Sequence, residues 1–290
     1  MGHPIGKGMF IWDLTVTAGG SPLALAAEAQ ELGLDWAALK ISNGTARFQP
    51  NLVPAAVEAL RSVEVEVYGW SYIYLVGRTM LLQGKEEADL SADVVLKYGL
   101  DGFLIDGENE CERPRGAVAA EHFATTIRLR LPRTPIGLCS FRFPSVHPKF
   151  PWRPLLQACD FHAQQVYWEK ANNPAEQLER SCRELRALKD LPIVPTGSAY
   201  AEHGWQPTVQ ELDAFDAKAH ALGLPGLSWW SLQAVENHPD FYAAIARHDW
   251  TPAEPGPFFT ELDFVEARAE LALWGVALGQ LTPDGHVRSR

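Results

Sequence analysis

Two acids separated by one glycine, Asp106 and Glu108, have the residue types and the spacing to perform chemistry together. They follow the apolar run Phe103-Leu-Ile105, which is typical of a buried strand. Side chains alternate along a strand, so both carboxylates lie on one face, roughly 6–7 Å apart at their backbones. Close carboxylates raise each other's proton affinity, so one can stay a neutral acid near neutral pH while the other is charged. The spacing therefore predicts a general acid with a carboxylate partner.

The competing interpretation of this pair is a solvated acidic loop, because Glu110 and Glu112 continue the acidic run. Runs of charge usually mark an exposed surface. An acid that directly follows Leu-Ile in a buried parallel strand differs from the average surface acid, and loop residues at strand ends often carry function. We therefore favour a catalytic role for Asp106 and Glu108.

The elements that must position this pair are short β-rich segments that alternate with amphipathic helical segments along most of the chain. The expected strands are 9–14, 35–41, 65–74, 102–106, 135–141, 160–168, 192–200 and 226–233. The expected helices are 22–32, 52–61, 85–98, 117–131, 175–188 and 209–222, with weaker ones after Trp152 and after Pro239. Start and stop signals support several helices: Ser21-Pro22 and Thr208 open two of them, and Gly33, Gly99 and Gly223 close three.

Eight repeated strand–helix units predict an α/β fold, a single (β/α)8 barrel (TIM barrel) over residues 1–250. The 290 residues suit one such barrel. An open doubly wound sheet is the main competitor, and no glycine-rich dinucleotide or phosphate motif follows the first strand. Residues 251–290 form a proline-containing linker and a C-terminal helix over 258–278, which we expect either to cover the barrel or to dock a protein partner. In a barrel the catalytic groups gather at the carboxyl ends of the strands.

Other expected strand ends supply polar and aromatic groups to the same edge. Asp13 ends the first strand and is our third candidate catalytic acid. The residues that we expect to bind substrate are Lys40, Tyr72, Tyr74, Gln165, Tyr167, Glu202, Trp229 and Trp230. For any one aromatic residue, core packing is the commoner role. Aromatic rings beside carboxylates suit a carbohydrate, because sugars place C–H faces on rings while their hydroxyls need polar partners.

The composition of the chain limits the classes of ligand and partner that we expect it to bind. The formal charge of −11 disfavours nucleic acid, and it slows the approach of strongly anionic polymers unless the negative charge lies away from the site. The sequence contains no run of eighteen apolar residues, so we expect no transmembrane helix. The start lacks the apolar stretch of a signal peptide, so we expect a chain that is cytoplasmic as made, or one exported or released by another route, for instance by a phage. The four cysteines and nine histidines show no metal-binding spacing, so we expect no metal and no cofactor.

The segment Asp101-Gly-Phe-Leu-Ile-Asp-Gly-Glu108 resembles the D-G-x-D-x-D-x-E signature of family 18 chitinases. The resemblance implies that Glu108 is the acid and that Asp106 helps the substrate's own N-acetyl group to attack the anomeric carbon. It also implies that Tyr167 on the sixth strand, and Trp229 or Trp230 on the eighth, contact substrate. Leu104 stands where that family has its middle Asp, a departure that bears on catalysis.

The front half of the chain is also similar to family 25 lysozymes. Those enzymes begin with an Asp at the end of the first strand, as Asp13 does here, and their second strand resembles residues 36–45, followed by Phe48 and Pro50. They also use an Asp-x-Glu on the fourth strand. Both resemblances imply an amino-sugar polymer as substrate.

Three functional hypotheses follow. The first is a glycoside hydrolase that acts on an N-acetylhexosamine-containing polysaccharide, peptidoglycan or a chitin-like polymer. The second is a non-catalytic carbohydrate-binding or assembly protein on a degenerate glycosidase barrel, motivated by Leu104. The third is a lyase or aldolase in which Lys40 forms a Schiff base. For Lys40 we prefer a structural ion pair with Asp13 or Asp106.

Overall fold

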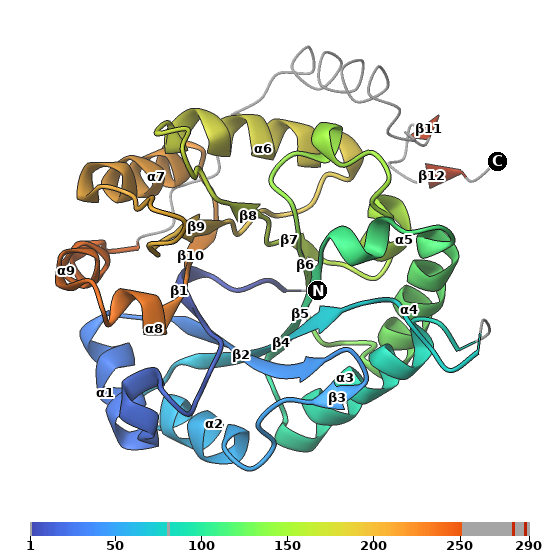
Figure 1. The fold of residues 1–290 in the computed structure, drawn as a ribbon, viewed down its shortest axis with the longest axis horizontal. Helices are drawn as coiled ribbons and strands as arrows, with labels where there is room; N and C mark the ends of the chain where they lie inside the picture. Colours follow the sequence, from blue (N-terminus) through green and yellow to red (C-terminus); the bar gives the residue numbers. More distant parts are fainter. Residues whose placement is uncertain (1, 80–81, 251–279, 282–286, 289–290) are drawn as a thin grey trace.

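The computed structural model describes residues 2–79, 82–250, 280–281 and 287–288. Parallel strands form the centre of the molecule and helices surround them (Figure 1). The strands are β1 (Gly6–Ile11), β2 (Trp36–Asn43), β4 (Glu66–Ile73), β5 (Gly102–Gly107), β6 (Ile136–Cys139), β7 (Phe161–His162), β8 (Gln165–Val166), β9 (Thr196–Ser198) and β10 (Gly226–Trp230). A short β3 (Ala46–Arg47) pairs antiparallel with β2, and β11 (Gln280–Leu281) pairs antiparallel with β12 (Val287–Arg288).

The sheet closes into a barrel through the sixth strand, which consists of β7 and β8 with two residues between them. The order of strands is β7-β6-β5-β4-β2-β1-β10-β9-β8, and every neighbouring pair on this path is parallel. Ala163 donates its backbone N–H to Leu138 on one side (2.9 Å), and Gln164 accepts from the Thr196 N–H on the other (2.9 Å). The described part of the chain therefore forms the predicted eight-stranded barrel.

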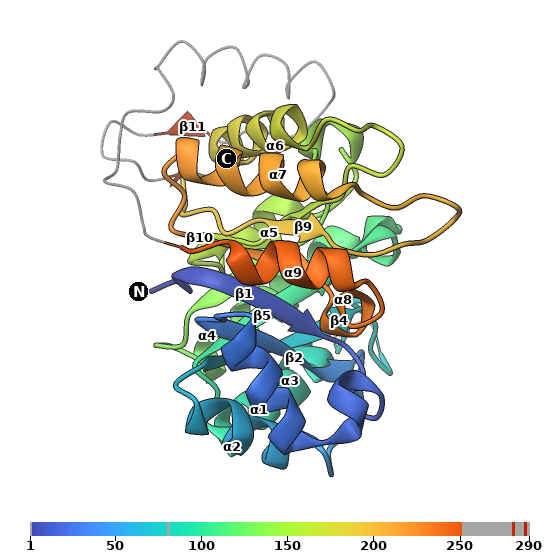
Figure 2. The ribbon, with the colours of Figure 1, turned by 90° about the vertical axis from the view of Figure 1, so that its left-hand side faces the viewer.

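The helices lie outside the strands, as Figures 1 and 2 show from two directions. They are α1 (Pro22–Glu31), α2 (Val53–Ser62), α3 (Lys85–Tyr98), α4 (Gly116–Arg130), α5 (Trp152–Leu156), α6 (Pro174–Leu188), α7 (Val209–Ala221), α8 (Leu232–Val235) and α9 (Pro239–Arg247). Short 3-10 turns are η1 (Thr17–Gly20), η2 (Asn109–Glu112) and η3 (Pro144–Val146).

The predicted helix boundaries have identifiable local causes. The Ser21 side chain accepts the Ala24 N–H at the start of α1, and Thr208 forms a reciprocal capping box with Glu211 at the start of α7. Gly99 ends α3 in the left-handed conformation, with φ 58°, which glycine adopts without a steric penalty. The described part of the chain contains no helix long and apolar enough to cross a bilayer.

Two apolar layers hold the barrel together. The barrel interior is filled mainly by large rings, among them Phe10, Trp36, Tyr68, Trp70 and Phe161. A second layer of aliphatic and aromatic residues fills the space between the strands and the helices. The four cysteines are free and buried.

The first strand begins and ends earlier than the sequence indicated. We expected residues 9–14, whereas β1 runs from Gly6 to Ile11. Glycines are uncommon in strands, but here Gly8 provides space for a ring, because a Cβ on Gly8 would lie 2.0 Å from the Trp36 ring. Residues 12–14 consequently lie in the loop that follows the strand. The predicted C-terminal helix, 258–278, lies outside the described residues.

Candidate active site

Strand β5 carries the two acids to the carboxyl end of the barrel. Leu104 and Asp106 face the interior; Leu104 is fully buried and Asp106 is 5% exposed. Glu108 follows the strand directly and is half-buried. The pair thus consists of a buried inner carboxyl group and an outer one within reach of a ligand.

Gln165, from β8, joins the two acids. Its Nε2 donates to Asp106 Oδ1 at 3.0 Å and to Glu108 Oε1 at 3.1 Å. The amide therefore uses both of its hydrogens on the acids and holds the two carboxyl groups next to one nitrogen. This convergence agrees with the predicted placement of all three residues at the carboxyl ends of their strands.

Both acids bind protons more tightly than exposed carboxylates do. Burial raises the pKa of Asp106 well above its ordinary value, and the negative charge of Glu108 raises it further, while Lys40 opposes the shift. Burial also raises the pKa of Glu108, against the hydrogen bond from Gln165. A pair of this kind keeps a proton at a pH where a solvated acid has lost it, which is what general acid catalysis requires.

Lys40 extends from β2 into a group of four aromatic rings at the same end of the barrel. Its Nζ lies 4.8 Å from the ring centre of Trp70, 4.9 Å from Phe48, 5.8 Å from Trp12 and 5.9 Å from Tyr72. Burial lowers the pKa of Lys40, and the charge of Asp106 acts in the opposite direction. Within the described chain Lys40 has no salt-bridge partner within 4.0 Å, so the direct ion pair with Asp13 or Asp106 that we preferred is wrong.

Asp13 is occupied by its own loop. Its Oδ1 accepts from the Thr15 N–H at 2.8 Å, from the Thr15 hydroxyl at 2.6 Å and from the Gln49 side chain. The hydrogen bonds from Thr15 are the main reason that the pKa of Asp13 is lowered. Asp13 lies two residues beyond the end of β1, where its side chain stabilises a turn. This corrects the expected placement of Asp13 at the strand end, and its catalytic role stays a prediction.

The two tryptophans at the end of β10 face opposite sides of the strand. Trp230 is half-buried and lies 5.5 Å from Trp70 and 5.8 Å from Phe10, ring centre to ring centre, so it faces the barrel interior. Trp229 is fully buried in the outer layer, 5.4 Å from the Phe215 ring. A substrate contact fits Trp230 and does not fit Trp229.

The remaining predicted binding residues lie near or beyond the carboxyl ends of β4, β8 and β9. Tyr72, in β4, donates its hydroxyl to Glu110 at 2.6 Å. Its ring centre lies 5.1 Å from that of Tyr74, which follows the end of β4. Tyr167 follows β8, and burial raises its pKa well above the ordinary value, so it remains a neutral hydroxyl donor. Glu202 is exposed in the loop after β9.

Two features of the site were not predicted from the sequence. His147, in the loop after β6, hydrogen-bonds Glu112 at 2.8 Å, and its charged form would lower the pKa of Glu108. The ring set around Lys40 is the other feature. Trp70 could have been found, since it lies two residues before Tyr72 on the same strand face. His147 carries no such signal, because its loop has no periodicity.

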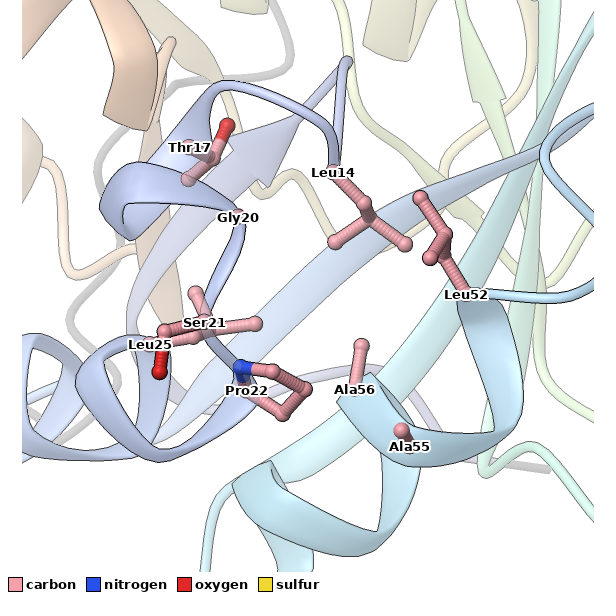
Figure 3. A pocket seen from close by; sticks show the side chains of 9 residues that line it. All are labelled: Leu14, Thr17, Gly20, Ser21, Pro22, Leu25, Leu52, Ala55 and Ala56. Atoms are coloured by element: carbon pink, nitrogen blue, oxygen red, sulfur yellow. The ribbon is translucent and has the colours of Figure 1, made fainter.

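A small apolar cavity of about 70 Å³ lies apart from these acids, between the loop after β1 and the first turns of α1 and α2 (Figure 3). Leu14, Pro22, Leu25 and Leu52 line it. It contains no carboxyl group, so we do not assign it to the site.

Comparison with known proteins supports the fold. No protein-family model and no curated protein matches the sequence. Among solved structures, a chitinase from Chromobacterium violaceum ATCC 12472 matches 84% of this chain and 98% of its own, with 12% identity and a TM-score of 0.61. The spore cortex-lytic enzyme SleL of Bacillus megaterium QM B1551 matches 86% of this chain and 75% of its own, with 11% identity and a TM-score of 0.60. An endo-β-1,4-mannanase from Thermotoga petrophila matches 93% of this chain and 77% of its own, with 9% identity and a TM-score of 0.60. The chain therefore has the barrel fold of glycosidases, while the similarity to family 25 lysozymes stays a prediction.

Proposed function

We propose that this protein is a glycoside hydrolase that acts on a polysaccharide containing N-acetylhexosamine. The observation that carries the proposal is the pair at the end of β5: half-buried Glu108, whose pKa is raised by burial, next to buried Asp106, both bound by Gln165. The pair occupies the end of the barrel where barrel enzymes bind substrate. Fold neighbours that act on chitin and mannan are consistent with the class of reaction.

In this proposal Glu108 donates its proton to the glycosidic oxygen while the bond from that oxygen to the anomeric carbon breaks. The resemblance to family 18 chitinases implies that the acetamido oxygen of the substrate forms the new bond to the anomeric carbon, with Asp106 holding the acetamido group. Water then opens this cyclic intermediate and returns a proton to Glu108. Burial of Asp106 beneath the half-buried Glu108 supports this division of roles.

Ring surfaces around the pair would bind the sugar. Trp12 is 48% exposed, and Tyr72, Tyr167 and Trp230 are half-buried around the same end of the barrel. Rings of this kind bind the C–H faces of a pyranose, and the carboxyl, amide and phenol groups between them can bind its hydroxyls.

One observation supports a second candidate, a carbohydrate-binding protein without hydrolytic activity. Leu104 is fully buried where family 18 chitinases have their middle Asp, so nothing acidic lies below Asp106 on the inner face of β5. In this protein Asp106 relies on Gln165 instead. Saccharide binding without any cleavage on prolonged incubation would favour this candidate.

The test is release of reducing ends from chitin oligosaccharides, purified peptidoglycan and mannan between pH 4 and pH 9. We expect wild-type cleavage of an N-acetylhexosamine polymer and a loss of about 10³-fold or more in Glu108→Gln, because the acid is removed while shape is kept. Glu121→Gln, on the exposed face of α4, is the matched control and should retain full activity. Cleavage by Glu108→Gln at the wild-type rate would refute the assignment, and cleavage of mannan alone would redirect the substrate.

A further inference from the structure

The ammonium group of Lys40 lacks hydrogen-bond acceptors from the protein. In the described part of the chain Lys40 forms no ion pair and donates no hydrogen bond, although its side chain is half-buried. Its close neighbours are the four rings of Trp12, Phe48, Trp70 and Tyr72. Ring faces attract a cation but do not replace the three acceptors that an ammonium group loses when water leaves.

The nearby negative charges do not meet this need. Asp106 acts on Lys40 electrostatically without direct contact, and burial raises the pKa of Asp106 well above its ordinary value. Glu110 is engaged by the hydroxyl of Tyr72. When a ligand displaces water from the rings, Lys40 therefore becomes a desolvated cation with open donors, an arrangement that is costly unless the ligand brings an anion.

The position of Lys40 restricts which anion can reach it. Lys40 lies on β2, which pairs with β4, and β4 pairs with β5, the strand of Asp106. A ring stacked on exposed Trp12 would lie beside Lys40, whose Nζ is 5.8 Å from the Trp12 ring and which interacts electrostatically with Asp106. An anionic substituent on a sugar fits this position, because the sugar face and the charge are recognised by adjacent groups.

We propose that Lys40 binds a free carboxylate carried by the sugar next to the Asp106–Glu108 pair, so that the site selects polymers in which N-acetylhexosamine alternates with an acidic sugar. The inference rests on the proposed function and names its substrate class. The carboxylate can come from a lactyl ether, as in peptidoglycan strands without stem peptides, or from a uronic acid, as in hyaluronan. Neutral chitin lacks it.

The overall charge of the chain makes a local cation necessary for such a ligand. The formal charge of −11 repels anionic polymers at long range. Salt screens exposed charges beyond about 10 Å at 0.1 M ionic strength, whereas a contact within a ring-lined site is screened much less. Lys40 supplies attraction at short range only.

The test measures binding in a cleavage-inactive background, so that its outcome does not depend on turnover. In Glu108→Gln protein, calorimetry would compare peptide-free peptidoglycan strands, the same strands with their carboxylates converted to methyl amides, hyaluronan oligosaccharides and chitin hexamer. We expect one of the two carboxylate ligands to bind about 10- to 100-fold more tightly than the amidated strands and chitin, the range of a charge-assisted hydrogen bond.

Adding Lys40→Met should remove this preference and leave binding of chitin and amidated strands within about twofold. Lys40→Arg should retain part of the preference. Lys97→Met is the matched control, since Lys97 also lies over a ring, that of Tyr98 at 4.9 Å, on the remote helix α3. Thermal melting of each variant checks folding.

Equal affinity of the Lys40-containing protein for charged and amidated strands would overturn the inference, as would an equal loss for all ligands in Lys40→Met. Absence of binding to every ligand would overturn it too. If the preference is present but wild-type protein cleaves none of the polymers, the inference stands and the hydrolase proposal fails in favour of a binding protein.

Discussion

Two lysines at opposite ends of the barrel have very different surroundings. Lys7, near the start of β1, is 3% exposed, and its Nζ donates to the carbonyls of Ile245 at 2.8 Å and His248 at 2.7 Å, at the end of α9. Lys40, near the carboxyl end of β2, is surrounded by rings and donates to no atom of the described chain. Burial lowers the pKa of both.

The difference separates a cation that stabilises the fold from one that is left for a ligand. A buried ammonium group is tolerated when the chain provides its acceptors, and carbonyls at a helix end are well suited to this. Where acceptors are missing, the stability of the fold does not explain why the residue is there. The contrast predicts that the same substitution destabilises the fold strongly at Lys7 and hardly at all at Lys40.

The largest expected effect is on stability, at the end of the barrel where β1 begins. Lys7→Met should lower the free energy of unfolding by about 3 kcal/mol, because it leaves the carbonyls of Ile245 and His248 without their donor in a buried position. Lys40→Met should change it by less than about 1 kcal/mol, since no protein hydrogen bond is lost. Urea unfolding of both variants measures this. Similar losses in the two variants would remove the distinction between them.

Two adjacent glutamines in the sixth strand also differ in whether their side chains have hydrogen-bond partners. Gln165 donates to both Asp106 and Glu108, whereas neither the oxygen nor the nitrogen of the buried Gln164 side chain has a partner. We expect Gln165→Leu to lower kcat about 10- to 100-fold, as expected for loss of hydrogen bonds to charged groups. Gln164→Leu, the matched control, should leave kcat unchanged.

The pH profile shows whether Gln165 positions the acids or only supports the fold. Its hydrogen bonds lower the pKa of both Asp106 and Glu108, so the descending limb of the profile should move to higher pH in Gln165→Leu. A fall in kcat with an unmoved limb, equal to that of Gln164→Leu, would reduce Gln165 to a packing residue.

Much of the site could be predicted, because it depends on two regularities: side chains alternate along a strand, and parallel strands end at one edge of the barrel. Asp106, Glu108 and Gln165 converge since parallel strands present their carboxyl ends at one edge. Trp229 and Trp230 were both named as binding residues, but neighbouring residues of a strand face opposite sides, so only Trp230 faces the barrel interior. Asp13 was wrongly expected at the end of the first strand. The glycines at the start of β1 are atypical of strands, so the strand was predicted to begin and end too late in the sequence.

Other features depend on contacts that no local pattern contains. The acceptors of Lys7 lie 238 and 241 residues away, at the end of α9. The rings around Lys40 come in part from the loops that contain Trp12 and Phe48, and a loop path leaves no periodicity in the sequence. Periodicity therefore predicted the strand ends but not the environment that distinguishes Lys40 from Lys7.

The smallest expected effect concerns how much the buried carboxyl group of Asp106 destabilises the folded state. Asp106 binds its proton more tightly in the folded chain than in the unfolded one, where its pKa is near the ordinary 3.8. As pH rises above that value, the unfolded chain releases the proton first, so the folded state loses stability until the raised pKa is passed. Asp106→Asn has nothing to release. It should therefore melt above wild type at pH 8 and close to wild type at pH 4.

The charge of Lys40 affects how much Asp106→Asn stabilises the protein at pH 8. The same experiment can therefore compare Lys40 with Lys7. Its charge opposes the raised pKa of Asp106, so in a Lys40→Met background the stabilisation by Asp106→Asn at pH 8 should increase. In a Lys7→Met background it should not change, because Lys7 does not act on Asp106. Scanning calorimetry of the two double variants at pH 4 and pH 8 measures both quantities. An equal increase in both backgrounds would mean that Lys40 has no special relation to the pair, and a melting difference independent of pH would mean that Asp106 is not the buried acid described here.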